Sequence, residues 1–595
     1  MAATAVRDRR ARPRSALRDL PWLAGIALHA APAATAVWAA LVLVGAFLEA
    51  GELFTMRGTV NALVGGRGHA VPWLLAMGGV FAVGQAVGLL RPYARERVRV
   101  RAGLAFYGAA LDRMAALPVR AWDTEDTFDV VRRVADGADR RGPDLIGEAF
   151  GVAEAVPAML ANAAALALVA VWLPAVVVAA MALLLWQRGR FGAKERALEV
   201  EWTRARRLAD YYSDVLTSRA HGAEVRLWGL GDLLIDRWRT AFGGYVDASL
   251  RLDTANTVRG LGSIVGMPAV FGLALAAVAL FGGRVQAGNA ALVLTALRSL
   301  FILISRYGRG VQAFVGHAGY ASDFRALLAL PAEAAPPNPS PFPHPLREGV
   351  SLRGVSYRYP DAGADALRGI DVEIRAGEVV ALVGANGAGK STLAQILVGL
   401  RPPSEGVVRF DGIDLATIDP TEVRRHCTAV FQQPLRYPDT LHRNVSLSGT
   451  ASGTHDLLTF VGLGDAHAPP AGAASAADDP LLSPEFGGVD LSGGQWQRLA
   501  IARALARPGA DLAVFDEPTA ALDPLAETEL FEQFARLAAG RTTILVSHRL
   551  GPTRLADRVL VLEAGRLVED GPPARLLAGN GPFARMFAAQ AGWYQ

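Results

Sequence analysis

The residues Gly384-Ala385-Asn386-Gly387-Ala388-Gly389-Lys390-Ser391 fit the pattern G-x-x-x-x-G-K-[ST] of a phosphate-binding loop. Its glycines allow a tight turn in which consecutive backbone N–H groups point at phosphate oxygens. A helix beginning near Lys390 would direct its positive dipole end at the same anion. Lys390 would reach the β- and γ-phosphates, and the Ser391 hydroxyl can bind Mg²⁺. With Thr392, which follows directly, this loop predicts a site for a nucleoside triphosphate.

The residues around the loop fit a soluble α/β fold. Val379–Val383 has the pattern of a buried strand, and Thr392–Leu400 has that of a helix. Among 60 lysines and arginines only Lys194 and Lys390 are lysines. Because arginine supplies nearly every other cation, a lysine at position 390 indicates a site that needs a compact ammonium group.

Composition indicates a membrane protein of several domains. A chain of 595 residues is too long for a single core. Hydrophobic residues make up 52% of the chain and charged residues only 19%, whereas the net charge of +4 gives no sign of a nucleic-acid partner. The single cysteine, Cys427, excludes an intrachain disulfide and a cysteine-based metal site.

Uncharged runs predict six membrane spans. Trp172-Leu173-Pro174 divides one run that is too long for a single span, and Arg298, Arg306 and Arg309 interrupt the last. A cleaved signal peptide is the alternative for the N-terminal run, but the uncharged stretch is longer than a signal needs. The runs are Ala30–Leu48, Ala70–Leu90, the two halves of Ala155–Trp186, Gly260–Gly283 and about Ala287–Val315.

Arginine-rich loops set the expected orientation. The long connections 91–144 and 187–259 carry many arginines, so the positive-inside rule places them in the cytoplasm. We therefore expect a multi-pass protein of the bacterial inner, or plasma, membrane, with both termini and the nucleotide-binding domain in the cytoplasm. Seven prolines in Pro331–Pro345 indicate a semi-rigid linker. We therefore expect an all-α six-helix transmembrane domain with cytoplasmic helical extensions (1–330), a linker (331–348) and an α/β P-loop ATPase domain with a helical subdomain (349–595).

Two carboxylates complete the expected hydrolytic site. Leu512–Phe515 has the pattern of a buried strand that ends in Asp516 and Glu517. Asp516 would hold Mg²⁺ through its water shell. Glu517 would orient or deprotonate the attacking water.

The stretch Leu491-Ser492-Gly493-Gly494-Gln495 resembles the LSGGQ signature of ATP-binding-cassette (ABC) transporters. The resemblance covers residues 349–595 by motifs and 1–330 by topology. It implies an adenine-stacking role for Tyr359, a Mg²⁺- and water-contacting role for Gln432, contact with a partner subunit near Asp523, and contact with the γ-phosphate for His548. Gln433 follows Gln432, so that assignment rests on the alignment of Val430-Phe431-Gln432. Glu485 stands out of register with the acidic loop that many exporters carry before the signature.

In the ABC family the signature completes the ATP site of a second subunit, so the resemblance implies a dimer. Ser492 and Gly494 at a helix N-terminus would offer a hydroxyl and N–H groups to a γ-phosphate. Because Glu517, His548 and the signature are intact, a homodimer is the simpler expectation, and a heterodimer with another half-transporter is the alternative.

The implied function is ATP-driven export, or flipping, of a small amphipathic molecule, peptide or lipid out of the cytoplasm or inner leaflet. An exporter-like importer and a non-transporting membrane ABC ATPase are the alternatives. Candidate segments that dock on the cassettes are Trp122–Phe128 and Glu224–Leu230, whose tryptophans could instead pack within helical extensions.

The sequence does not identify the cargo. Glu49 and Glu52 could line a cavity for cations or pair with Arg57 near the outer interface. Arg298 and Arg306 could contact an anionic cargo, pair with Glu148 or Glu154, or extend towards the membrane surface.

Overall fold

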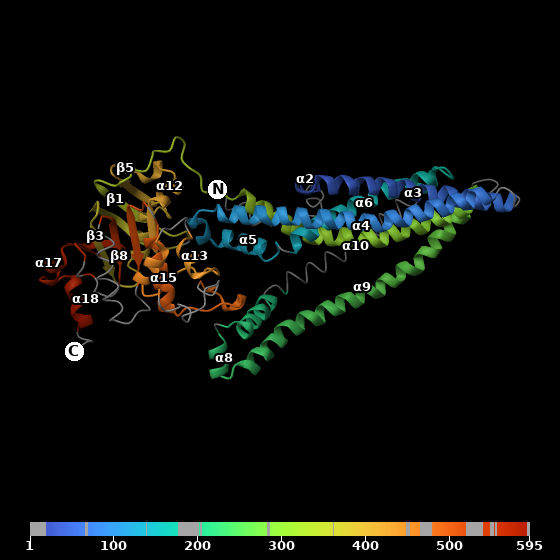
Figure 1. Ribbon diagram of the computed structural model, residues 1–595. Helices are drawn as coiled ribbons and strands as arrows, with labels where there is room; N and C mark the ends of the chain where they lie inside the picture. Colours follow the sequence, from blue (N-terminus) through green and yellow to red (C-terminus); the bar gives the residue numbers. More distant parts are fainter. Residues whose placement is uncertain are drawn as a thin grey trace, which may run out of the picture. The chain divides into compact units, whose positions relative to one another are not determined.

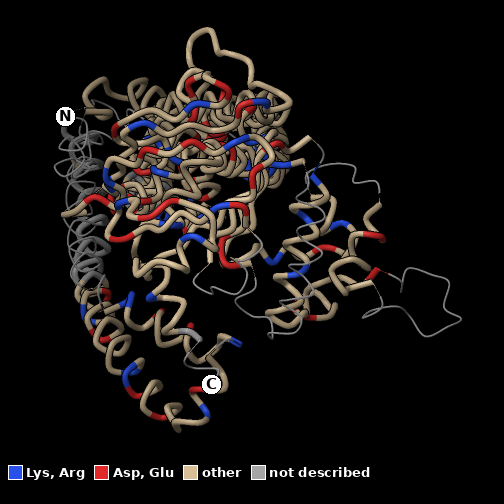
Figure 2. Tube along the Cα trace, turned by 90° about the vertical axis from the view of Figure 1, so that its left-hand side faces the viewer, with Lys and Arg blue, Asp and Glu red and all other residues tan. Residues whose placement is uncertain are grey.

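The computed structural model (Figure 1) describes residues 20–65, 70–138, 140–175, 202, 205–219, 221–281, 286–360, 362–447, 453–464, 479–507, 509–518, 540–547, 553 and 556–591. The chain divides into two units, of which the first contains Met1–Ala115 and Asp129–Leu330. The second contains Pro331–Gln595 together with Ala116–Phe128. Acidic and basic residues are interspersed along the trace in Figure 2, in keeping with the small net charge.

The first unit is built from long helices. α3 packs against α4, and α10 packs against α6 and α3. In Figure 1, α9 diverges from these helices over much of its length. The helices are α2 (Leu20–Ala30), α3 (Pro32–Gly65), α4 (Ala70–Ala115), α5 (Glu125–Ala135, which crosses the boundary between the units), α6 (Arg141–Ala167), α8 (Gly222–Leu227), α9 (Gly231–Phe281) and α10 (Ala287–Ala329).

Several of these helices fit a membrane and extend past it. In the described part of the chain, α3, α4 and α6 are long and apolar enough to cross a bilayer. The 46 residues of α4 would span about 69 Å, against a hydrocarbon core of about 30 Å. This length is enough for the span to extend well beyond the bilayer.

The helix that follows Arg141 is interrupted close to Trp172-Leu173-Pro174, where the sequence predicted a break between two spans. α6 ends at Ala167, and turns follow before helical residues resume at Leu173. Residues 176–200, which hold most of the expected fourth span, lie outside the described residues. The predicted fifth and sixth spans fall on α9 and α10, and Arg298 lies exposed on α10 without ending that helix.

The second unit contains two sheets. A four-stranded antiparallel sheet has the order β2-β1-β4-β5, and a six-stranded, mostly parallel sheet has the order β10-β9-β3-β8-β7-β6. The bounds are β1 (Gly349–Tyr357), β2 (Leu367–Arg375), β3 (Val379–Gly384), β4 (Glu405–Phe410), β5 (Ile413–Asp414), β6 (Cys427–Val430), β7 (Leu512–Asp516), β8 (Thr542–Val546), β9 (Arg558–Glu563) and β10 (Arg566–Gly571). Every residue of β7 and β8 is buried, as expected for parallel strands covered on both faces.

Helices flank these sheets and form a separate helical region. Trp496 lies in an apolar cluster that joins α13, α14 and α15 to the β6–β7 side of the sheet, apart from the main core around β1, β3 and α11. The helices are α11 (Lys390–Leu397), α12 (Pro420–Arg425), α13 (Leu441–Val445), α14 (Thr454–Phe460), α15 (Gly493–Leu505), α17 (Pro573–Leu577) and α18 (Pro582–Ala591), with 3₁₀ turns η4 (Val119–Asp123), η5 (Leu415–Thr417) and η7 (Pro484–Phe486). The predicted fold class, helices followed by an α/β ATPase domain with a helical subdomain, matches this arrangement.

Candidate nucleotide-binding site

Backbone conformation explains the glycines of the phosphate-binding loop. Gly384 ends β3 with φ +153°, and Gly389 precedes α11 with φ +100°. A Cβ on Gly384 would lie 2.2 Å from the carbonyl oxygen of Leu562, and one on Gly389 would lie 2.5 Å from that of Ala366. Both positions therefore require glycine for the chain to turn from the strand into the helix.

Lys390 lies folded back over the loop. Its Nζ donates to the carbonyl oxygens of Gly384 at 2.9 Å and Ala385 at 3.0 Å. Burial lowers the pKa of Lys390, and the nearby carboxylates of Glu517 and Asp516 act in the opposite direction. An ammonium group that is buried among carbonyls has the charge and position to meet a phosphate in this loop.

The predicted acidic pair lies beside the loop. Asp516, the last residue of β7, is 5% exposed. Burial raises the pKa of Asp516, while a hydrogen bond with Ser391 lowers it in part. Ser391 and Asp516 are therefore brought together, although they are far apart in the sequence.

Glu517 adopts a backbone conformation that is uncommon for a residue other than glycine. Its φ is +51°, and its backbone N–H donates to the carbonyl oxygen of Val546 at 2.9 Å. The Glu517 carboxylate accepts a hydrogen bond from Nε2 of Gln432 at 2.9 Å. The contact involves Gln432, the residue that the Val-Phe-Gln alignment selected over Gln433.

These residues share one open cleft of about 550 Å³. At one side of it, the Tyr359 hydroxyl lies 3.0 Å from Oγ1 of Thr392. The lining residues are Tyr359, Ala366, Asn386, Gly387, Gly389, Lys390, Ser391, Thr392, Gln432 and Glu517. The structure thus brings together the predicted adenine-stacking residue, the phosphate loop, and the Gln432–Glu517 pair.

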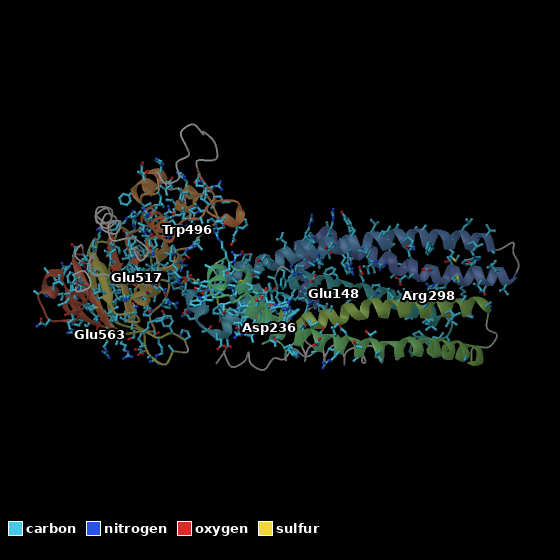
Figure 3. All side chains as sticks on the ribbon, turned by 90° about the horizontal axis from the view of Figure 1, so that it is seen from below. Glu148, Asp236, Arg298, Trp496, Glu517 and Glu563 are labelled. Atoms are coloured by element: carbon cyan, nitrogen blue, oxygen red, sulfur yellow. The ribbon has the colours of Figure 1, made fainter. Side chains whose placement is uncertain are left out.

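The signature stretch lies elsewhere in this unit. Ser492 caps α15: its Oγ accepts from the Gln495 N–H at 3.2 Å, and the Gln495 side chain accepts from the Ser492 N–H at 2.8 Å. Leu491 is buried in the Trp496 cluster, whereas Ser492 and Gly493 are exposed. Among the described residues that line the cleft, none belongs to Leu491–Gln495. Figure 3 labels Trp496 in this helical region and Glu517 at the cleft.

Two predicted site residues cannot be placed. Asp523 and His548 lie outside the described residues. Glu485 falls in the short 3₁₀ turn η7 and is exposed.

The structure also shows a network of contacts behind the Tyr359 ring that the sequence motifs did not predict. Arg401, 6% exposed, donates through both terminal nitrogens to the Asp123 carboxylate and also to the Tyr357 hydroxyl at 3.0 Å. Its guanidinium lies over the Tyr359 ring, 5.0 Å from the centroid. Asp123 belongs to the segment Ala116–Phe128, which sequence analysis assigned to the transmembrane domain and which packs within the second unit. Spacing along the chain could not predict this pair, because 278 positions separate the partners.

Polar side chains inside the first unit form their own contacts. Glu154, 3% exposed, accepts from Nε1 of Trp38 at 3.0 Å and pairs with Arg95 at 3.3 Å. Asn162 donates to Glu49 at 3.4 Å. Glu154, one of the two expected partners for Arg298 and Arg306, thus has an ion-pair partner in Arg95.

Comparison with known proteins assigns the family. The ABC transporter family profile matches residues 367–520, which include the phosphate loop, the signature and the acidic pair. The ATP-bound structure of a bacterial Atm1-family ABC exporter aligns with a TM-score of 0.77 and 25% identity, over 94% of this chain and 98% of that one. The matched residues form an ABC transporter ATPase domain, and the chain as a whole has the fold of an ABC exporter. It has the exporter arrangement, in which apolar helices and an ATPase domain share one polypeptide.

Relatives of this ABC protein carry different cargo names. The subtilin transport ATP-binding protein SpaT of Bacillus subtilis is 30% identical over 64% of this chain and 62% of its own length. The ATP-dependent lipid A-core flippase of Chromobacterium violaceum is 36% identical over 53% of this chain and 54% of its own. The cyclolysin secretion/processing protein CyaB of Bordetella pertussis is 37% identical over 42% of this chain and 34% of its own. The chain therefore spans less than two thirds of each of these curated relatives.

Proposed function

We propose that this chain is half of an ATP-driven exporter or flippase that moves a small amphipathic molecule, peptide or lipid out of the cytoplasm or inner leaflet. The main support is that Lys390, Gln432 and Glu517 line one cleft. The same polypeptide contains helices that are long and apolar enough to cross a membrane. The names of SpaT and the flippase refer to a peptide and a lipid, which fits this range of cargo. Alternating access, driven by closure of two cassettes over ATP, would provide the movement.

ATP would lie along the cleft from Tyr359 to Glu517. The Tyr359 ring would stack on adenine, with Arg401 behind it holding its position. The loop N–H groups between Gly384 and Ser391 would bind the β-phosphate, and Lys390 would turn from the loop carbonyls towards the γ-phosphate.

The residues at the end of the cleft fit a magnesium ion as well as a triphosphate. Ser391, Asp516 and Gln432 offer hydroxyl, carboxylate and amide oxygens, the hard ligands that Mg²⁺ prefers. When bound, Mg²⁺ would neutralise charge on the phosphate oxygens. Asp516 contributes a buried negative charge there, and Ser391 orients its hydroxyl towards that carboxylate.

Glu517 is the proposed general base. Its carboxylate lies in the same cleft as Lys390, and the Gln432 amide holds it at 2.9 Å. In this position it would accept a proton from the water that attacks the γ-phosphate. His548 would contact the γ-phosphate and Asp523 would contact the partner, by the family resemblance alone.

The site requires a second copy. Ser492 and Gly493 are exposed at the start of α15 and are not part of the cleft on their own chain. In a two-fold pair, each signature would face the phosphates bound by the other copy.

In the predicted docking segment Glu224–Leu230, Leu227 and Trp228 are 77% and 71% exposed, which supports a contact with a partner rather than packing within the chain. The intact motifs favour a homodimer, and a heterodimer is the alternative.

A reconstituted system tests this function. We expect the purified protein in lipid nanodiscs to hydrolyse ATP with Mg²⁺, and one class of lipid, amphipathic drug or short peptide to stimulate it. Vesicles loaded with that class should then show ATP-dependent transport, with the cassettes on the side that represents the cytoplasm. Ion conductance without transport would contradict the proposal and favour a channel.

A further inference from the structure

We propose that His344, His426 and Asp511 form a binding site for a divalent first-row transition-metal ion, of the kind represented by Zn²⁺. The site lies in the second unit, away from the nucleotide cleft, and joins the proline-rich linker to the six-stranded sheet. The donor atoms of the three side chains all lie within 4.8 Å of one another.

The sheet register brings two of these residues together. β6 and β7 are parallel neighbours in which Cys427 pairs with Leu512, so the residues that precede them, His426 and Asp511, are also neighbours. The Asp511 N–H donates to the His426 carbonyl at 2.9 Å. The linker then adds the third residue: Phe342 stacks on the His426 ring with centroids 4.6 Å apart, and His344 follows two positions later.

The side chains point their donor atoms at one place. Nδ1 of His344 lies 2.7 Å from Oδ2 of Asp511, and Nδ1 of His426 lies 3.3 Å from the same oxygen. The other Asp511 oxygen, Oδ1, accepts from the backbone N–H of Leu346, which fixes the carboxylate and leaves Oδ2 facing the two rings. A backbone carbonyl, that of Gly509, lies 3.2 Å from Nδ1 of His426 and is available as a further ligand.

The two separations from Asp511 Oδ2 are close to those in tetrahedral coordination. Metal–ligand bonds of 2.0–2.1 Å place neighbouring donor atoms about 3.3 Å apart. The His426–Asp511 separation already has this value. His344 would need to draw back by roughly half an ångström, which its half-exposed side chain on the linker permits.

The surroundings also resemble those of a metal ligand. A metal-binding histidine usually donates its other ring N–H to a carboxylate, which orients the ring. Nε2 of His426 lies 3.6 Å from Oε1 of Glu422, on the opposite side of the ring from Nδ1. Cys427 is next in sequence, but its side chain is buried and its sulfur is not among the clustered donor atoms, so the ligands are nitrogen and oxygen. Two imidazoles and a carboxylate favour Zn²⁺, Ni²⁺ or Cu²⁺ over Mg²⁺ or Ca²⁺.

Zinc binding to the full chain tests the proposal. Protein without an affinity tag is stripped with a chelator, and Zn²⁺ alone is titrated in competition with a chromophoric chelator. We expect one ion per chain, and at least a tenfold loss of affinity in H344A and in H426A. E422Q should lose about tenfold, because it removes the carboxylate that faces Nε2 of His426. Replacement of Zn²⁺ by Co²⁺ should give the visible absorption of a tetrahedral site in the wild type and not in H344A or H426A.

The matched control is H442A, because His442 pairs with a single carboxylate, Asp479, at 3.0 Å in the same unit. It should bind Zn²⁺ like the wild type. Thermal stabilisation by ATP is measured for every variant and reports that its nucleotide-binding domain is folded. If H426A does not fold, the zinc affinity of H344A tests the proposal by itself. Equal zinc binding by the wild type and H344A would overturn the proposal, and the two histidines would then only contact the Asp511 carboxylate.

Discussion

The phosphate-binding cleft and the signature end of α15 differ in how far one chain completes them. In the cleft, Lys390, Asp516, Glu517 and Gln432 each have a partner within the same unit. At the signature, the side chains of Ser492 and Gln495 bond to each other's backbone N–H groups and to no other group in the described part of the chain, and the start of the helix is exposed. One region is organised to hold a nucleotide, whereas the other presents a helix terminus that its own chain does not use. If the signature completes the site of a second copy, as proposed, each ATP site is shared between two chains.

The largest expected effect is on ATP hydrolysis, from a substitution in the cleft. Replacement of the general base in E517Q should reduce ATP turnover about 100-fold or more while ATP binding persists. Steady-state hydrolysis and equilibrium nucleotide binding measure the two effects. E563Q is the matched control, since Glu563 also ends a strand of the same sheet but is exposed (Figure 3). Normal hydrolysis by E517Q would remove Glu517 from its proposed role.

Lys390 is expected to act mainly in nucleotide binding. K390A should weaken ATP binding by about tenfold or more, because it removes the ammonium that contacts the phosphates. K390R should not restore it, since a planar guanidinium with a fixed fork of donors does not replace the compact ammonium group that would contact the phosphates. Nucleotide titration of the three proteins gives the affinities. Wild-type affinity in K390R would show that charge alone is sufficient.

The buried charge of Asp516 is expected to favour Mg²⁺–ATP binding and to lower the stability of the nucleotide-free fold. Because burial raises the pKa of Asp516, its charge destabilises the nucleotide-free fold at neutral pH, where the unfolded chain carries the same charge in water. D516N should therefore raise the melting temperature without nucleotide and lose the further stabilisation that Mg²⁺ with ATP provides. The gain should shrink as the pH falls towards the ordinary aspartate pKa of about 3.9, below which both proteins are neutral here. A lower melting temperature in D516N at pH 7 would contradict this account.

The smallest effect is expected at the network behind Tyr359. D123N leaves Arg401 its bonds to Tyr357 and Gln395 but removes the bidentate ion pair. We expect a KM for ATP a few times higher, with kcat changed less, because the change acts through the position of the Tyr359 ring. D126N, in the same segment, is the control. Equal effects of the two substitutions would show that Asp123 has no specific link to the nucleotide.

Local motifs predicted the cleft because their residue types and spacing are fixed by phosphate chemistry. The strand before Gly384, the helix after Lys390 and the meeting of Ser391 with Asp516 follow from that pattern and from the parallel sheet. Asp123 and Arg401 could not be predicted, because their contact depends on how a distant segment packs. The same is true of His344, His426 and Asp511, which only the sheet register and the linker bring together. The long helices were predictable from hydropathy, since a bilayer demands length and apolarity of each span.

A crosslink between the cleft and the signature tests most directly whether two copies share one site. N386C and S492C place thiols at exposed positions of the two regions, and the native Cys427 is buried. In the E517Q background, which should hold ATP, oxidation is expected to yield a disulfide-linked dimer only when the chain carries both cysteines and ATP with Mg²⁺ is present. Either single cysteine should give far less. If ATP binds, both thiols react with a small reagent and no interchain disulfide forms, the signature does not face the phosphates of a second copy.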